Sequence, residues 1–465
     1  MDRLLQSWVD RWPFRRHDDA KAGWSGARVS RANFAKWLYV GLHIKRWLLL
    51  ILLGVVLMAL GIAYLLREVY VSYAFPDWVG TATLQFLPRW LRGLLFISSA
   101  TIITVFATWK LNRSLVGAVV PLNEGEDLVS RIWQQRTQDR GPKVAVIGGG
   151  TGLSTLLRGL KSYTGNISAI VTVADDGGSS GVLRRDLNVI PPGDIRNCIA
   201  ALADAEPLVT RLFQYRFGDD AGHGIAGHSF GNLFIVAMSE VTGNMEVAIR
   251  ETSRVLAVRG RILPATLANI TLGARLADGA TIHGESVLPE AGSPIEQVFI
   301  EPADAPVNAE VVAALLDADL IVMGPGSLYT SVLPNLLVPG LADAVEASRA
   351  HKVFVSNVAT QRGETDGFNA ADHYAAIRRH LGSDVADVVL ANSNLPADPL
   401  PAEWQSEAVL APGDADYGDA RLVLADLVDP EHRYRHDSDR LAAAVMRQYY
   451  ERDLRIQAPS TTAGA

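Results

Sequence analysis

Cysteine is nearly absent from this chain, which has 465 residues and a single thiol, Cys198. One cysteine excludes an intramolecular disulfide and any metal site built from several cysteines. The scarcity agrees with a reducing compartment. A cleaved signal peptide is not expected either, because the first long apolar run starts at residue 47, behind a polar leader.

Excess positive charge is confined to the first 46 residues. Residues 1–46 hold ten Lys or Arg against four Asp, a net of +6, so the rest of the chain carries −13 for a whole-chain charge of −7. An extended basic face is the footprint of nucleic-acid binding, and we therefore expect no nucleic-acid partner. The leader either touches anionic lipid headgroups or stays solvated.

Two uncharged apolar runs predict a membrane hairpin. Residues 47–66 have the 20-residue length that a helix needs to cross the hydrocarbon layer. Residues 93–109 are shorter and more polar, and a buried or interfacial helix is the alternative for them. The basic leader places the N-terminus in the cytoplasm, and two spans joined by the loop 67–92 return the chain to that side. We expect a multi-pass protein of the inner (cytoplasmic) membrane with its soluble domain in the cytoplasm.

Behind a polar linker, residues 110–142, the pattern is that of an α/β domain over residues 143–455. Its apolar runs alternate with helical patterns, and they are Val144 to Ile147, Ile167 to Val173, Leu320 to Met323, Val353 to Val358 and Val388 to Ala391. This alternation predicts a mainly parallel sheet that is covered on both faces. Residues 261–300 predict an antiparallel portion, residues 440–451 a last helix and residues 456–465 a disordered tail.

A glycine-rich turn after the first apolar run predicts a phosphate-binding site. Its residues are Gly148, Gly149, Gly150, Thr151, Gly152 and Leu153. Consecutive glycines let the backbone turn sharply, and the helix that follows favours a phosphate at its positive N-terminal end. Leu153 stands where a dinucleotide fingerprint has its third glycine, which weakens a nicotinamide interpretation. A tight turn without a ligand is the alternative.

Two adjacent acids, Asp175 and Asp176, follow the second apolar run. An acid at this strand end commonly binds a ribose hydroxyl, and paired acids beside a diphosphate can hold Mg²⁺. The alternative is a solvated turn. Further along, Asp194 either caps a helix or faces the same cleft, together with Arg196 and Asn197 in the first turn of that helix.

Two later strand ends carry small and polar side chains of the kind that bind phosphates, sugars or bases. Backbone N–H groups and hydroxyls suit phosphate oxygens at the first, and amide and carboxylate groups suit a base or sugar at the second. The predicted binding residues are Gly324, Gly326, Ser327 and Thr330 at the first, and Asn357, Gln361, Glu364 and Thr365 at the second. A tight turn and a capped connecting loop are the respective alternatives.

Residues 227–231 match the G-x-S-x-G pattern of a hydrolase, which would make Ser229 a nucleophile. The preceding residues are polar and glycine-rich, whereas a nucleophile elbow follows a buried strand. We instead expect His228, Ser229 and Asn232 to form the floor of the nucleotide cleft at a helix N-terminus. A metal site at His223 and His228 is the remaining alternative.

Six segments in order, IGGGTGLSTLLRGLK, VTVADDGGSSGVLR, PPGDIRNC, GHSFGNL, GPGSLYTSVLPNLLV and NVATQRGETDGF, closely resemble the bacterial gluconeogenesis factor (YvcK-like) family. That family is related to 2-phospho-L-lactate transferase (CofD-like). The resemblance implies a Rossmann-like three-layer α/β/α sandwich that binds a UDP-sugar or related nucleotide. It also implies roles in growth on gluconeogenic carbon and in cell shape through envelope-precursor supply. Usual members are soluble, so residues 1–142 are a departure from them.

The transferase relative implies a second function, the transfer of a phospholactyl-type group from a nucleotide diphosphate donor with Mg²⁺. By that resemblance, Asp175 or Asp176 matches an acidic position near the acceptor and the metal. No clear acceptor base is present in the sequence, and we therefore favour a nucleotide-sugar-binding regulator over an enzyme. We also expect a homo-oligomer and envelope-synthesis proteins as partners.

Overall fold

The computed structural model describes residues 44–72, 76, 84, 86–119, 138, 140–204, 207–222, 224–395, 405–432 and 434–457. The chain divides into two units, residues 1–133 and 134–465, and each is described by itself. Most of the predicted basic leader, linker and tail lie outside the described residues.

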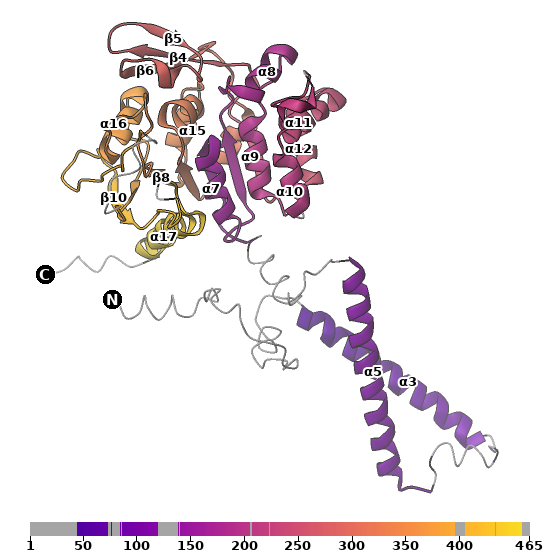
Figure 1. The fold of residues 1–465 in the computed structure, drawn as a ribbon. Coiled ribbons are helices and arrows are strands. Elements are labelled where there is room, and N and C mark those ends of the chain that lie inside the picture. The colour runs from indigo at the N-terminus through magenta and orange to yellow at the C-terminus, as the bar shows by residue number, and fades with distance from the viewer. Residues whose placement is uncertain are drawn as a thin grey trace, which may run out of the picture. The chain divides into compact units, whose positions relative to one another are not determined.

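In the first unit, the described residues form two long helices, α3 (Ile44–Ser72) and α5 (Arg89–Val119) (Figure 1). The two predicted apolar segments lie within them. Their described apolar side chains are widely exposed, with Leu57 60% and Ile102 68% exposed. In the described part of the chain, no single helix combines the length and hydropathy required to cross a membrane. One bent pair of helices, Leu328–Leu336 with Leu341–Ala347, meets these two requirements by length and composition alone.

In the second unit, seven parallel strands form one sheet in the order β10-β9-β8-β7-β1-β2-β3. The strands are β1 (Val144–Gly148), β2 (Ile167–Val171), β3 (Arg261–Pro264), β7 (Leu320–Met323), β8 (His351–Val355), β9 (Val388–Asn392) and β10 (Arg421–Ala425). Every residue of β1, β2, β7 and β9 is buried. Because successive side chains of a strand point to opposite faces, both faces of the sheet are covered, as predicted.

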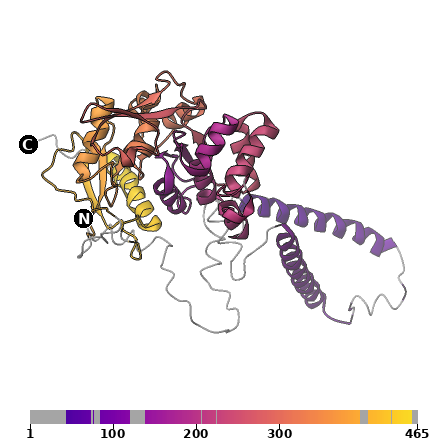
Figure 2. The same ribbon diagram turned by 45° about the horizontal axis from the view of Figure 1, so that its top comes forward.

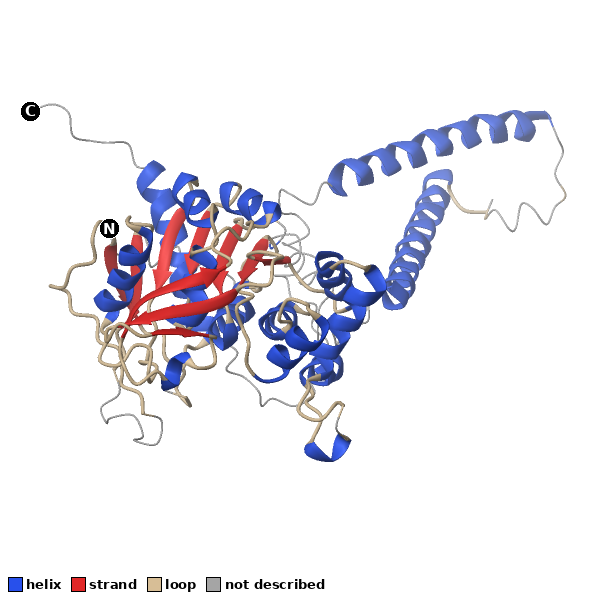
Figure 3. Cartoon of the chain, turned by 90° about the horizontal axis from the view of Figure 1, so that it is seen from above, coloured by secondary structure: helices blue, strands red, loops and turns tan. Residues whose placement is uncertain are grey.

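Helices flank this sheet (Figure 3). They are α7 (Gly150–Leu160), α8 (Gly178–Leu187), α9 (Gly193–Leu202), α10 (Pro207–Gln214), α11 (Phe230–Thr242), α12 (Met245–Val255), α13 (Ala309–Leu316), α14 (Leu333–Leu336), α15 (Leu341–Ala347), α16 (Ala370–Leu381) and α17 (Ser438–Gln457), with short helical turns η1 (Asp219–Ala221), η2 (Leu288–Glu290) and η3 (Leu328–Val332). The last helix, α17, packs against α7 (Figure 2). The bent pair noted above is buried in this unit, where Leu328, Leu333 and Leu336 belong to the core.

The strand order reverses direction between β1 and β7. From β1 the chain proceeds through β2 to β3, whereas β7 lies on the other side of β1 and leads to β8, β9 and β10. In open parallel sheets of this kind, ligands bind in the crevice beyond the carboxyl ends of the strands that flank such a reversal. The topology therefore places a ligand site after Gly148 and Met323.

A second, three-stranded antiparallel sheet, in the order β5-β4-β6, is inserted before β7. It consists of β4 (Thr271–Leu276), β5 (Thr281–His283) and β6 (Ile295–Glu301). The predicted antiparallel portion is thus confirmed for residues 271–301, whereas its first piece, β3, is a parallel strand of the main sheet.

The chain segment ahead of β1 is fixed to the loop between α7 and β2. Gln138 is buried and its side-chain Nε2 donates to the Ser162 carbonyl over 3.1 Å. The Gln138 carbonyl accepts from the Gly165 N–H over 2.9 Å. Arg259 donates to the side-chain oxygen of Gln138. The chain therefore reaches β1 through an anchored residue.

Candidate functional site

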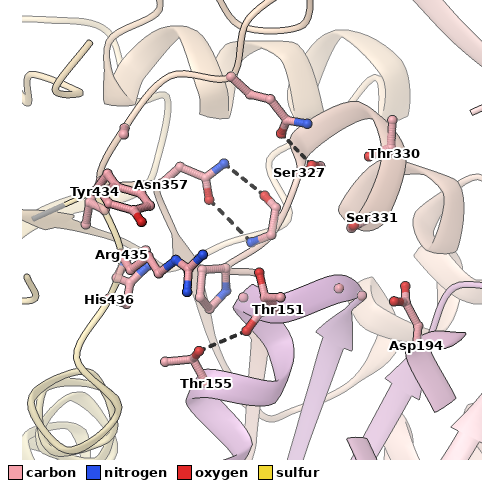
Figure 4. A pocket seen from close by; sticks show the side chains of 18 of the residues that line it. Thr151, Thr155, Asp194, Ser327, Thr330, Ser331, Asn357, Tyr434, Arg435 and His436 are labelled. Atoms are coloured by element: carbon pink, nitrogen blue, oxygen red, sulfur yellow. Dashed lines mark hydrogen bonds between the residues drawn. The ribbon is translucent and has the colours of Figure 1, made fainter. Parts of the chain in front are cut away.

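A cavity of about 670 Å³ lies at the reversal point of the sheet, beyond the carboxyl ends of β1 and β7 (Figure 4). Its lining comes from eight segments of the chain and is mostly polar. The lining residues are Gly149, Gly150, Thr151, Gly152, Thr155, Thr172, Asp175, Asp194, Glu285, Pro325, Gly326, Ser327, Thr330, Ser331, Asn357, Val358, Ala359, Thr360, Gln361, Ser406, Tyr434, Arg435 and His436.

Two glycine-rich turns, one after β1 and one after β7, touch each other in this wall. A Cβ added to Gly152 would lie 2.6 Å from the Pro325 carbonyl oxygen and 2.9 Å from the Gly326 Cα. Gly150 has φ +62°, a conformation that side chains other than glycine rarely adopt. Only glycine therefore fits this contact, which brings the N-terminal end of α7 against the second turn.

The second turn is held by amide side chains. Asn357 donates its Nδ2 to the Gly326 carbonyl over 2.9 Å and accepts from the Gly326 N–H over 3.3 Å. Figure 4 shows this pair beside the Ser327 hydroxyl, which donates to Gln361. Gln361 in turn donates to Glu364. These contacts fix the loop geometry before any ligand arrives, which is what preorganised binding requires.

Three carboxyl groups line the cavity, and their pKa values are raised. Burial raises the pKa of Asp194 to about 6, although the Gly150 N–H donates to this carboxylate and opposes the shift. Burial also raises the pKa of Asp175. Burial, and then the charges of Asp175 and Asp194, raise the pKa of Glu285 to about 8. Glu285 is therefore mostly protonated at neutral pH and can donate a hydrogen bond.

The adjacent acids Asp175 and Asp176 point to different places. Asp175 lines the cavity and accepts from the Gly177 N–H over 2.9 Å. Asp176 accepts from the N–H groups of Ser286 over 2.9 Å and Glu285 over 3.2 Å, in the turn after β5. Of the predicted pair, Asp175 therefore faces the cavity, and Asp176 holds the turn after β5.

One cationic side chain, Arg435, is found among the described residues that line the cavity. Its guanidinium carbon lies 5.2 Å from the ring centroid of Tyr434. Figure 4 shows Arg435 and His436 on the side of the cavity that Thr151 also faces. Burial lowers the pKa of His436 to about 4, so this imidazole is neutral at physiological pH. Arg435 is the group that can offset the charge of a bound phosphate here.

In the part of the chain that the structure describes, no group of three or more His, Cys, Asp or Glu side chains is arranged to hold a metal ion. Asp175 and Asp194 are both in the cavity wall, and Mg²⁺ is often held by one or two carboxylates together with substrate phosphates. His223, from the alternative metal site, lies outside the described residues.

The structure brings about half of the predicted site residues into the cavity wall. Those that line it are Gly149, Gly150, Thr151, Gly152, Asp175, Asp194, Gly326, Ser327, Thr330, Asn357 and Gln361. Those that lie outside its lining are Gly148, Leu153, Asp176, Arg196, Asn197, His228, Ser229, Asn232, Gly324, Glu364 and Thr365. Leu153 is fully buried in the hydrophobic core, because it lies on the inner face of α7.

Ser229 is the N-cap of α11, where its hydroxyl accepts from the Asn232 N–H over 3.3 Å. The residue is completely buried. The Nδ1 of the neighbouring His228 lies 2.9 Å from the Ser179 hydroxyl. The hydrolase interpretation of Ser229 is therefore replaced by a structural one, as a helix cap.

Sequence reasoning missed Glu285, Tyr434, Arg435 and His436. Glu285 belongs to the antiparallel insert, more than a hundred residues from either of the first two strand ends, and no apolar run precedes it directly. The other three lie in His432-Arg433-Tyr434-Arg435-His436, a dense group of cationic and aromatic residues just ahead of the last helix. That composition was an available signal for a ligand-facing loop.

Comparison with known proteins gives one family throughout. The family model described as 2-phospho-L-lactate transferase CofD matches residues 144–428. A putative gluconeogenesis factor of Nostoc sp. is 45% identical over 430 residues, which cover 89% of this chain and 92% of that protein. The gluconeogenesis factor of Bacillus subtilis is 46% identical over 311 residues, which cover 66% of this chain and 97% of that protein.

A crystal structure of a Bacillus halodurans protein has the same fold, with a TM-score of 0.63 and 44% identity over 66% of this chain and 99% of that one. The relatives thus differ in length. A match that covers 89% of this chain necessarily extends ahead of the α/β body, whereas a match of 66% is about as long as the body alone. This corrects the expected departure, because part of residues 1–142 is shared with relatives.

Proposed function

The chain belongs to the CofD family, among its YvcK-like gluconeogenesis factor relatives, and on that premise we propose that it binds a nucleotide diphosphate sugar, such as a UDP-sugar, in the cavity at the reversal point of the sheet. Its role is regulatory: it reports the supply of that precursor during growth on gluconeogenic carbon and so supports envelope synthesis and cell shape.

The contact between the two glycine turns carries this proposal. The turn at Gly150 to Gly152 begins α7, and its N-terminal end presents backbone N–H groups and a positive dipole end to a diphosphate. The turn at Pro325 and Gly326 touches it from the strand next to β1. Two backbone turns that meet beside a cavity of about 670 Å³ provide room and donors for a phosphate chain with attached groups.

The charges of the lining support a sugar as part of the ligand. Three carboxyl groups beside a diphosphate would repel it if all were ionised. The raised pKa values keep Glu285 protonated at neutral pH, and Arg435 supplies a positive charge. Carboxyl groups are good partners for ribose and sugar hydroxyls, and Asp175 is at the strand end where such contacts are made. A Mg²⁺ bound at Asp175 would also reduce the repulsion between this carboxylate and the diphosphate.

A transferase is the second candidate function, and Asp194 is the observation that favours it. A carboxylate with a pKa of about 6 in the cavity wall is suited to accept a proton near neutral pH. An acceptor hydroxyl would lose its proton to Asp194 and attack the phosphorus that carries the transferred group, and the bond to the nucleoside monophosphate would break. Release of nucleoside monophosphate would distinguish this enzyme from a regulator.

We also propose that α3 and α5 anchor the protein in the cytoplasmic membrane. A 29-residue helix such as α3 is about 44 Å long, and the hydrocarbon layer is about 30 Å thick. Exposed apolar side chains on both helices suit a lipid environment. Two hydroxyls of α5 are satisfied within the helix, since Ser98 donates to the Leu94 carbonyl and Thr101 to the Ile97 carbonyl.

Titration calorimetry on the detergent-solubilised full chain tests the binding proposal. We expect UDP-sugars to bind more tightly than GDP, NAD or deazaflavin, with and without Mg²⁺. Gly152→Ala pushes against Pro325 and should weaken binding at least about tenfold, because the added Cβ separates the two turns. Gly413→Ala is the matched control, since nothing lies within 4 Å of its added Cβ. Equal affinities for both variants would contradict the assignment.

A further inference from the structure

Two arginines lie at the N-terminal end of α11, outside the lining of the cavity. Arg196 comes from α9, and Arg216 from the segment between α10 and α11. Burial lowers the pKa of Arg196, and the positive charge of Arg216 lowers it further. Arg196 donates from Nη2 to Asn197 over 2.9 Å, but its Nε is buried without a hydrogen-bond partner in the described residues.

The fold makes space for this pair. A Cβ on Gly231 would lie 2.8 Å from Cγ and 2.9 Å from Cδ of Arg196, so the missing side chain admits the stem of the arginine. Arg216 faces Ser229 across an isolated antiparallel bridge and donates to the Gly227 carbonyl. Both arginines are thus held against the first turn of α11 by backbone geometry.

A hydrogen-bond chain supplies a further donor at the same place. The Asn232 Nδ2 lies 3.1 Å from the Ser179 hydroxyl, and an amide nitrogen can only donate. The hydroxyl lies 2.9 Å from Nδ1 of His228 and can donate to it when the imidazole carries its proton on Nε2.

This cluster adjoins the cavity. Asp175 and Asp194 line the cavity, and both attract the Arg196 guanidinium. The helices α8 and α9 start beside it as well: Ser180 of α8 bonds to Asp175, and a Cβ on Gly193 of α9 would lie 2.4 Å from the Ser180 hydroxyl. Helix N-termini carry partial positive charge, which adds to the charge of the two arginines.

We propose that Arg196 and Arg216, with His228 at their side, bind an anionic group, a phosphate or a carboxylate, on the molecule that shares the cavity with the nucleotide. Planar guanidinium forks match such groups, and an anion between two arginines removes their mutual repulsion. The inference rests on the proposed function, since it assigns an acidic class to the sugar or second reactant. The anion is carried either by the nucleotide-sugar itself, as in a uronic acid, or by a separate phosphorylated molecule.

The test uses the full chain in detergent and two anionic probes. In the first arm, calorimetry compares UDP-glucuronate with UDP-glucose. In the second arm, the rise in melting temperature caused by inorganic phosphate is measured with and without saturating UDP. Arg196→Gln and Arg216→Gln are compared with Arg211→Gln, an exposed arginine of α10 that removes the same charge. Arg216 is exposed, so its variant is available should Arg196→Gln unfold the protein.

We expect Arg196→Gln and Arg216→Gln to weaken the binding of one anionic probe about tenfold and to leave the affinity for UDP-glucose unchanged. Arg211→Gln should leave the binding of every probe unchanged. A loss confined to UDP-glucuronate supports a carboxylate on the bound sugar. A loss confined to phosphate supports a separate phosphorylated reactant. Unchanged affinities for both probes overturn the anion site. If the wild-type chain binds no UDP compound, the proposed function fails, whereas phosphate stabilisation that is lost in both arginine variants still supports the site.

Discussion

The adjacent acids Asp175 and Asp176 have different structural roles. Asp175 is in the cavity wall, while Asp176 accepts two N–H groups from the turn after β5. That turn carries Glu285, which also lines the cavity, so Asp176 helps to position a third carboxyl group there. The cavity thus gains a carboxyl group from a sequence-distant insert through a residue that does not line it.

Glu285 makes the stability of the protein depend on pH. Its pKa is raised from 4.5 to about 8, so the folded state retains a proton that the unfolded chain releases. Stability therefore falls as the pH rises from about 4.5 to about 8, by at most about 1.4 kcal/mol per pH unit for this group. We expect Glu285→Gln to have nearly the wild-type melting temperature at pH 5 and a higher one at pH 8. Thermal unfolding at both pH values checks this.

Glu290→Gln provides the control for that experiment, because Glu290 is an exposed acid in the connection between β5 and β6. Its substitution should shift the melting temperature alike at both pH values. A Glu285→Gln variant that parallels the wild type from pH 5 to pH 8 would show that Glu285 is ionised throughout and that its carboxylate is stabilised by contacts or solvent.

At the scale of elements, Glu285 belongs to the antiparallel insert β5-β4-β6, and Asp176 binds the turn of this insert that contains Glu285. Asp176→Asn replaces a charged acceptor of two N–H groups by a neutral one, so we expect faster hydrogen exchange at residues 284–287 and weaker UDP-sugar binding. Asp278→Asn is the matched control, because Asp278 accepts from the Ala280 N–H in the turn between β4 and β5. Identical exchange in the two variants would mean that Asp176 does not hold the insert.

Strand-forming segments were predictable where apolar runs are continuous, because such runs are typical of strands buried on both faces. The runs beginning at Val144, Ile167, Leu320 and Val388 start at the first residue of β1, β2, β7 and β9. The edge strand β10 was missed, although its residues Leu422 to Ala425 form an apolar run as long as that of β9. Its side chains are partly exposed, as is usual at the edge of a sheet.

The site was predictable to the extent that its residues follow strands. Gly149 to Gly152 and Gly326 come directly after β1 and β7, and the order of a parallel sheet brings such ends together. Arg435 and Glu285 follow no strand of the main sheet, and only the tertiary fold brings them to the cavity. Leu153 was assigned to the ligand by its place in a glycine pattern, but helical periodicity directs its side chain to the core.

At the scale of the whole molecule, the two units suggest an anchored protein with a ligand-binding body. If α3 and α5 both cross the membrane, the ends of the chain are on the same side. We expect a reporter that is active only in the periplasm to stay silent when fused after Ala465 and to be active when inserted near Asp77. Both fusion proteins must be produced in equal amount, as judged by immunoblot. An active reporter after Ala465 would indicate a single crossing and would separate the body from cytoplasmic nucleotides.

The anchored Gln138 has a mechanical consequence. A pull on the chain ahead of residue 138 meets the hydrogen bonds of Gln138 to Ser162, Gly165 and Arg259 before it reaches β1. The load is thus spread over the α7–β2 loop and the segment before β3, and the glycine turn at the far end of β1 is spared. We therefore expect that tension on the chain ahead of Gln138 is carried by these hydrogen bonds and leaves the shape of the cavity unchanged.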